Sequence, residues 1–121
     1  MPQIETLQNE VSLPAPVANY VRAVNTGTRE EFAASFAADA VVVDVNRELR
    51  GLEAIAEWAG TDIFAADVRF DILEVTERQA RTILTLRIDG TFDRTGLPDP
   101  LVMKQEFTVA DGKITELRIG F

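Results

Sequence analysis

The chain contains neither cysteine nor histidine among its 121 residues. Without thiols it can form no disulfide, no thiolate nucleophile and no zinc site built on cysteine. Without imidazoles it lacks the commonest catalytic base and the commonest ligand of transition metals. Any catalysis must therefore depend on Asp, Glu, Tyr, Lys or Arg side chains or on water. We expect no metal and no other cofactor.

Positive charge is also scarce. Lys and Arg number 12 against 20 Asp and Glu, which gives a net charge of -8 and a pI of about 4.5. Such a surface repels phosphate backbones and anionic lipids, so we expect neither nucleic acid nor membrane as a partner. The first residues lack the basic start and apolar run of a signal peptide, and no apolar run is long enough to span a bilayer. The expected location is the cytoplasm.

Two helices are predicted near the start of the chain. The first begins at Pro14, because proline suits the first helical turn, and ends at Gly27, which can adopt the left-handed conformation of a helix cap. A capping box, T-x-x-E, at residues 28–31 predicts a second, short helix. Phe32 and Phe36 would share one face of this second helix.

A strand and a third helix follow. The unbroken valines of residues 40–45 predict a strand that is buried on both faces. Residues 46–51 are predicted to form a turn, and residues 52–60 a helix. From residue 67 onward apolar and polar residues alternate, which predicts four antiparallel strands, interrupted by a loop at residues 93–100.

This order of elements predicts an α+β fold with an N-terminal arm, residues 1–13, and a single domain, residues 14–121. Early helices and late strands favour a curved antiparallel sheet with the helices packed across its open side. A sheet of this kind forms a cone-shaped hollow, which is a natural pocket for a small ligand.

Four segments carry a family resemblance: residues 20–27 (YVRAVNTG), 36–44 (FAADAVVVD), 50–55 (RGLEAI) and 111–114 (DGKI). In this order they resemble the nuclear-transport-factor-2-like superfamily, and within it the SnoaL-like and ketosteroid-isomerase-like branch, over residues 14–121. The resemblance implies the cone-shaped fold, a small apolar ligand, chemistry without a cofactor, and a homodimer formed through the open face of the sheet.

Asp44 is the main catalytic candidate. It ends the valine-rich strand, and burial among apolar side chains disfavours the ionised form of a carboxyl group, which raises the pKa of a general base toward neutral pH. The resemblance places Asp44 where ketosteroid isomerases keep the aspartate that moves a proton next to a carbonyl. The other interpretation is an aspartate at a strand end that accepts hydrogen bonds from the turn at residues 46–51.

Tyr20 and Gln105 are polar residues on otherwise apolar elements. Tyr20, the only tyrosine, matches the isomerase tyrosine that donates to the developing oxyanion, although its hydroxyl could instead bind a backbone carbonyl. Gln105 falls near the position of the isomerase's second acid, and a different gap would place Met103 there. A glutamine can donate a hydrogen bond but cannot share a proton as a carboxylic acid does; here too the alternative is a contact with backbone.

Further residues complete the predicted site. Arg87 and Asp89 share one strand face at the Arg-x-Asp spacing of limonene epoxide hydrolase, and the alternative is a surface ion pair worth ~0–1 kcal/mol. The remaining pocket wall is predicted to contain Trp58, Phe107, Met103 and Asn46.

Two functions stay open, together with a less favoured epoxide-hydrolase-like activity. The first is an isomerase or polyketide cyclase that transfers a proton on an apolar carbonyl compound, with Asp44 as base, Tyr20 as oxyanion donor and Gln105 as a helper. The second is a non-catalytic module for ligand binding or dimerisation. Convergence of the three side chains on one closed cavity would favour the enzyme, and a solvated Asp44 tied to the turn would favour the binding module.

Overall fold

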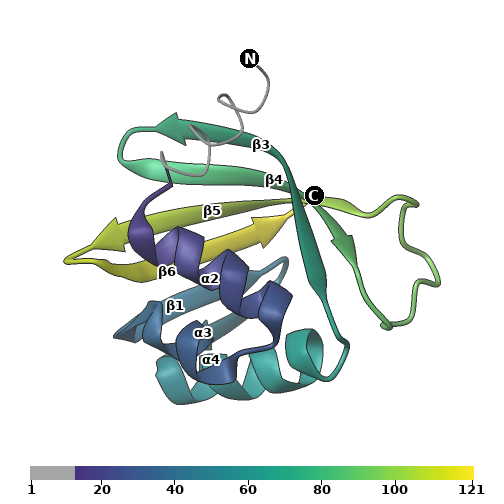
Figure 1. Cartoon of the computed structure of the whole chain (residues 1–121), viewed down its shortest axis with the longest axis horizontal. Helices are drawn as coiled ribbons and strands as arrows, with labels where there is room; N and C mark the ends of the chain where they lie inside the picture. Colours follow the sequence, from purple (N-terminus) through teal and green to yellow (C-terminus); the bar gives the residue numbers. More distant parts are fainter. Residues whose placement is uncertain (1–12) are drawn as a thin grey trace.

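The computed structural model describes residues 13–121 (Figure 1). The predicted arm, residues 1–13, lies outside the described residues except for Leu13, which is buried and belongs to the hydrophobic core. Within residues 13–121 the elements are α2 (Ala15–Thr26), α3 (Arg29–Ala34), β1 (Phe36–Asp44), β2 (Arg47–Arg50), α4 (Leu52–Ala59), the π-helical segment η1 (Gly60–Phe64), β3 (Arg69–Arg78), β4 (Arg81–Asp89), β5 (Val102–Ala110) and β6 (Lys113–Gly120).

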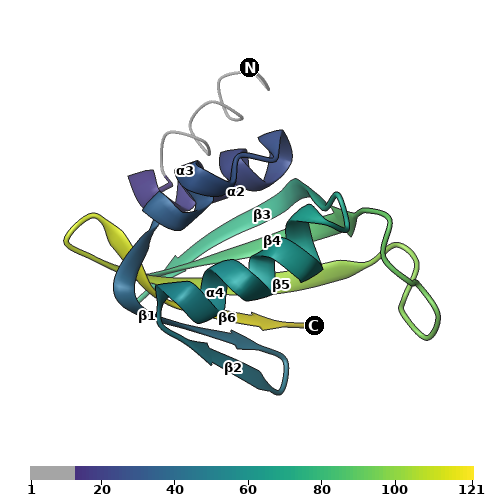
Figure 2. The same cartoon turned by 90° about the horizontal axis from the view of Figure 1, so that it is seen from below.

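The six strands form one mixed sheet in the order β2-β1-β6-β5-β4-β3. The four late strands are antiparallel as predicted, whereas β1 and β6 run parallel to each other. The helices lie across one face of the curved sheet (Figures 1 and 2), which confirms the predicted α+β architecture. The parallel pair joins an early strand to the last one, and local sequence patterns do not reveal a pairing between such distant segments.

Helix α2 has the predicted limits. Pro14 precedes its first turn, and Gly27 ends it in the left-handed conformation at a φ of 71°. Helix α3 differs from the prediction. The Thr28 side chain makes no capping hydrogen bond, and its hydroxyl instead pairs with that of Thr26 at 2.8 Å. Phe36 does not belong to α3, because it begins β1 and is buried there.

Strand β1 is longer and less buried than predicted. It starts at Phe36, and Val42 on its inner face is fully buried, whereas Val41 and Val43 on the outer face are only partly buried. The reason is that helices cover one face of the sheet only. The predicted turn at residues 46–51 contains strand β2, which forms a tight hairpin with β1.

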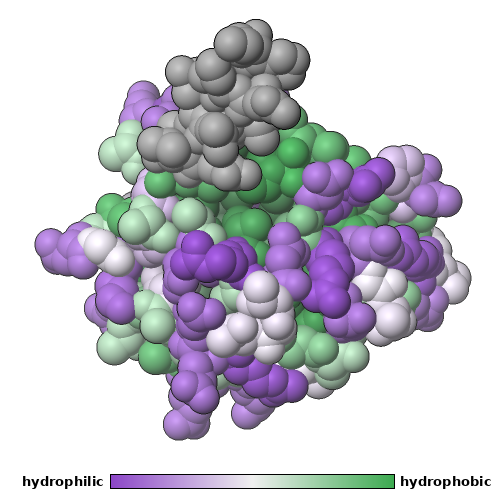
Figure 3. Space-filling view, viewed as in Figure 1, coloured by the Kyte–Doolittle hydropathy of each residue, from purple (hydrophilic) through white to green (hydrophobic). Residues whose placement is uncertain are grey.

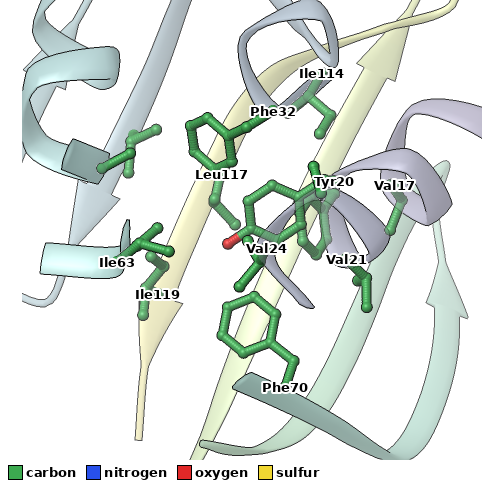
Figure 4. Close-up of a cluster of buried hydrophobic side chains, with 14 of the residues drawn as sticks. Val17, Tyr20, Val21, Val24, Phe32, Ile63, Phe70, Ile114, Leu117 and Ile119 are labelled. Atoms are coloured by element: carbon green, nitrogen blue, oxygen red, sulfur yellow. The ribbon is translucent and has the colours of Figure 1, made fainter. Parts of the chain in front are cut away.

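The core lies between the helices and the sheet. Figure 4 shows Tyr20 in the middle of this cluster, with Phe32 and Phe70 on either side of it. In Figure 3 hydrophilic side chains cover most of the helix-bearing face, and hydrophobic ones show in its middle. None of the helices within residues 13–121 combines the length and the apolar composition needed to cross a membrane.

Candidate functional site

A cavity of about 380 Å³ opens between the inner face of the sheet and the segment formed by α4 and η1. Most of its wall is apolar, and the polar groups come from five side chains on four separate segments of the chain, namely α2, β1, the α4–η1 segment and β5. The lining residues are Tyr20, Asp44, Trp58, Asp62, Ile63, Val68, Phe70, Ile88, Phe92, Leu97, Leu101, Met103, Gln105, Ile119 and Phe121.

The register of the sheet explains how two of the polar groups meet there. Asp44 on β1 is the partner of Ile119 on β6, and Ile119 is in turn the partner of Gln105 on β5. Residues in one such row point to the same face of the sheet, and neighbouring strands are about 4.8 Å apart. The backbones of Asp44 and Gln105 are therefore separated by about 10 Å, with both side chains directed into the cavity.

Asp44 has two hydrogen-bond donors. Trp58 donates through Nε1 to Oδ2 at 3.1 Å, and Arg47 donates through Nη2 to the same oxygen at 3.3 Å. The second carboxylate oxygen, Oδ1, accepts no hydrogen bond from residues 13–121. The Asp44 side chain is 22 % exposed. The wholly apolar surroundings expected from the valines are thus not found, because the β1–β2 hairpin places Arg47 opposite Asp44.

Arg47 continues this contact to a second carboxylate. Its Nη2 also donates to Oδ2 of Asp62, on η1, and Asp62 lines the same cavity. The hydrogen bond that Arg47 donates to Asp62 is the main reason that the pKa of Arg47 is raised above its ordinary value. The two acids therefore share one guanidinium nitrogen at the edge of the cavity.

Tyr20 and Gln105 form a hydrogen-bonded pair. The Tyr20 hydroxyl donates to Oε1 of Gln105 at 2.8 Å, and both residues are at least 98 % buried, with exposed fractions of 0 % and 2 %. Figure 4 shows the hydroxyl directed toward Ile63 and Ile119, which line the cavity. Neither side chain is bound to backbone, so the backbone partner that the alternative interpretation gave to each of them is wrong. The tyrosine proton is nonetheless directed at Gln105 and not at open space.

The amide nitrogen of Gln105 faces the cavity. No hydrogen bond from Nε2 is found within the described part of the chain, yet in that part no fully buried side-chain nitrogen or oxygen lacks a partner. Nε2 must therefore be accessible from the cavity that Gln105 lines. A ligand atom that accepts a hydrogen bond would satisfy it.

Tyr20 predicts a pH dependence of stability. Burial raises the pKa of its hydroxyl far above the ordinary value, and the negative charge of Asp44 adds to this. Above about pH 10 the unfolded chain releases this proton while the folded protein retains it. The free energy of unfolding should therefore fall by about 1.4 kcal/mol per pH unit from this residue alone.

Urea unfolding of the wild type and of Tyr20→Phe between pH 8 and 11.5 would measure this effect. The variant is expected to be less stable at pH 8 by about 1–3 kcal/mol, because Oε1 of Gln105 loses its donor. Above pH 10 the two stability curves should converge, since the variant has no phenol to ionise. Parallel curves throughout would contradict the assignment.

The structure brings some of the other predicted residues to the cavity and keeps others away. Trp58 and Met103 line it. Phe107 belongs instead to the core, where it is fully buried and meets the ring of Tyr20 edge-on at 5.2 Å between centroids. Asn46 is exposed in the hairpin between β1 and β2 and lines no part of the cavity.

Arg87 and Asp89 are exposed and outside the cavity. They do not pair with each other. Arg87 binds Asp71 on the neighbouring strand at 3.1 Å, and Asp89 binds Arg94. The hydrogen bond from the backbone of Gly90, and next the contact with Arg94, lower the pKa of Asp89. The two residues therefore form surface ion pairs, as the alternative interpretation had it, but with other partners.

Two charged residues of the site were not anticipated from the sequence. Asp62 follows Trp58 by four residues, a spacing that places two side chains on one helix face, so the periodicity of the third helix could have revealed it. The position of Arg47 had no such signal in the sequence. The hairpin that brings Arg47 to Asp44 turns at Val45 and Asn46, and it contains no glycine that would predict a tight turn. Within residues 13–121 no group of three or more acidic side chains is arranged to hold a metal ion.

A family model for the SnoaL-like domain matches residues 17–117. The match spans most of the chain, and the protein therefore belongs to the SnoaL-like family. The resemblance inferred from the sequence segments is confirmed by this match. No curated protein sequence matches the chain.

Solved structures share the fold of this chain. A candidate polyketide cyclase from Sinorhizobium meliloti is 28 % identical with a TM-score of 0.81, and the alignment covers 91 % of this chain and 97 % of that one. The Δ5-3-ketosteroid isomerase from a Mycobacterium species is 25 % identical, with a TM-score of 0.70 and coverage of 88 % and 90 %. A Mycobacterium tuberculosis protein in complex with estradiol-17β-hemisuccinate is 20 % identical, with a TM-score of 0.71 and coverage of 89 % and 93 %.

Proposed function

We propose that the protein binds a small apolar carbonyl compound in this cavity and transfers a proton on it, as an isomerase or cyclase does. The observation that carries the proposal is the shared row of the sheet, which directs Asp44 and Gln105 into one apolar cavity with Tyr20 behind Gln105. The names of two relatives, a candidate polyketide cyclase and a ketosteroid isomerase, support the same class of chemistry.

In the proposed reaction the substrate carbonyl accepts a hydrogen bond from Nε2 of Gln105. Oδ1 of Asp44 removes a proton from a carbon next to that carbonyl, and negative charge develops on the carbonyl oxygen. Asp44 then returns the proton to another carbon. Trp58 and Arg47 hold Oδ2 and so keep Oδ1 turned toward the substrate. Gln105 thus takes the direct donor role that the sequence predicted for Tyr20, and Tyr20 fixes its orientation.

Deuterium exchange tests this proposal. A Δ5-3-ketosteroid would be incubated with the protein in D₂O, and both isomerisation and uptake of deuterium next to the carbonyl would be followed by NMR. We expect exchange in proportion to protein concentration, because proton removal precedes any later step. Binding of the steroid without exchange would contradict the enzymatic proposal.

Binding of the steroid without deuterium exchange would favour a non-catalytic binding module. Two observations agree with such a role. Asp44 is tied to Arg47 and partly exposed, and the amide of Gln105 is a weaker donor than the carboxylic acid of an isomerase. An affinity for apolar ketones together with no exchange would identify a carrier or sensor.

We further propose that the protein forms a homodimer through the outer face of the sheet. A shallow hollow of about 420 Å³ lies on that face, with charges of both signs on its wall, such as Glu106 and Arg118. Phe121 at its edge is 67 % exposed. A face of this composition can be complementary to a second copy related by two-fold symmetry.

Static light scattering would measure the mass in solution. The wild type should be a dimer, and Arg118→Glu should be a monomer because it places like charges at the interface. Arg22→Glu, on the exposed side of α2, changes the net charge equally and should remain dimeric. A wild type that stays monomeric at all concentrations would exclude the dimer.

A further inference from the structure

The charged side chains that line the cavity are both acidic. They are Asp44 and Asp62, and one cation, Arg47, is shared between them. Within the described residues these contacts leave one negative charge uncompensated at the edge of an apolar cavity. Like charges held close together favour the uptake of a further positive charge.

Asp62 lies where the cavity meets a second hollow. This neighbouring hollow, of about 430 Å³, shares Asp62 and Phe92 with the main cavity. Its other lining residues offer no charge, and the hydroxyls of Thr61 and Thr91 already donate to backbone carbonyls. A ligand that extends from the main cavity into this hollow therefore passes the Asp62 carboxylate, which is 40 % exposed.

A second and independent observation concerns a hydrogen-bond donor in the main cavity. Gln105 is 2 % exposed, its Oε1 is occupied by Tyr20, and its Nε2 donates to no acceptor in residues 13–121. Nε2 is therefore open to the cavity, where water or a bound molecule can accept its hydrogen bond. The cavity thus offers a donor at its buried end and carboxylates at its open end.

We propose that the ligand of this cavity is an apolar molecule that carries a protonated amine, with the ammonium group bound at Asp62. This inference rests on the proposed function only in placing the ligand in the same cavity. The ammonium replaces part of the contact that Arg47 makes with Asp62 and supplies the missing positive charge. Asp44 remains available to the apolar body of the ligand, whose carbonyl reaches Gln105. A carboxylate-bearing ligand is disfavoured, because it meets two acids.

Three probes with one apolar body and different charges test the proposal. They are 1-adamantylamine, 1-adamantanol and adamantane-1-carboxylate, and their dissociation constants would be measured by isothermal titration calorimetry at low and high salt. We expect the amine to bind about tenfold more tightly than the alcohol, and the carboxylate to bind most weakly. High salt should reduce the difference, since the pair at Asp62 is partly exposed to solvent.

Matched variants locate the effect. Asp62→Asn should reduce the affinity for the amine to that for the alcohol and leave the alcohol unchanged. Arg47→Gln should have the opposite sign and strengthen amine binding, because it removes the competing cation. Glu48→Gln is the control, since Glu48 lies on β2, pairs with Arg50 and is outside the cavity. It removes the same charge as Asp62→Asn and should change nothing.

Several results would overturn the proposal. These are no measurable binding of the amine, equal affinities for amine and alcohol, the same loss in Glu48→Gln as in Asp62→Asn, and a loss of amine binding in Arg47→Gln. The proposed reaction is judged separately. A preference for the amine that depends on Asp62, without any deuterium exchange on a ketosteroid, would support this inference and contradict the proton-transfer function.

Discussion

Under the proposed reaction, replacing Asp44 by asparagine is expected to reduce turnover of a Δ5-3-ketosteroid by about 10²–10⁴-fold, the usual contribution of a general base. The substitution preserves the shape of the side chain and an oxygen that can accept from Trp58, so the cavity should keep its form. It removes the one property that the reaction requires of this side chain, which is the ability to take up a proton. The substrate should still bind, because the apolar wall is unchanged.

Steady-state kinetics and thermal unfolding of the same preparations would separate the two effects. Asp39→Asn is the matched control, because Asp39 lies on the same strand but is exposed and outside the cavity. Its turnover should equal that of the wild type. If Asp44→Asn kept wild-type turnover, Asp44 would not be the base, whatever the role of the cavity.

The second large effect concerns stability and should appear in Phe107→Ala. Phe107 is fully buried and contacts Tyr20 at the centre of the core. Removing a buried aromatic ring costs about 3–5 kcal/mol, the sum of lost burial and of the cavity left behind. This is a large part of the 5–15 kcal/mol that stabilises a typical domain.

Urea unfolding would measure the loss. Leu73→Ala serves as the comparison, because Leu73 is 53 % exposed on β3 and its truncation should change stability by less than about 0.5 kcal/mol. Equal losses in the two variants would show that Phe107 does not hold the core together. A small loss combined with altered ligand affinity would return Phe107 to the cavity wall, where the sequence had predicted it.

The sequence predicted the fold well because its signals are local. Pro14 and Gly27 limit a helix through their own backbone preferences, and the alternation of β4 places Leu84 and Leu86 in the core without reference to other segments. The same reasoning failed for β1. Its valines suggested burial on both faces, but whether the outer face is covered depends on distant parts of the chain.

The candidate site was only partly predictable for the same reason. Tyr20 and Gln105 stood out because each is a polar residue on an apolar element, and the structure joins them. Asp44 was predicted to face a pocket and it lines the cavity, but its contact with Arg47 depends on a hairpin at Val45, whose positive φ of 59° is uncommon for a β-branched residue. Because a valine rarely adopts this backbone conformation, the sequence did not predict the hairpin or the contact that depends on it.

The position of β6 in the sheet determines at which stage of folding the cavity can form. Strand β6 is final in the chain but central in the sheet, between β1 and β5, and the hydrogen bond of Tyr20 with Gln105 spans 85 positions. Contacts between such distant segments are established slowly during folding. The row that directs Asp44 and Gln105 into the cavity therefore forms only after β6 has been inserted between β1 and β5.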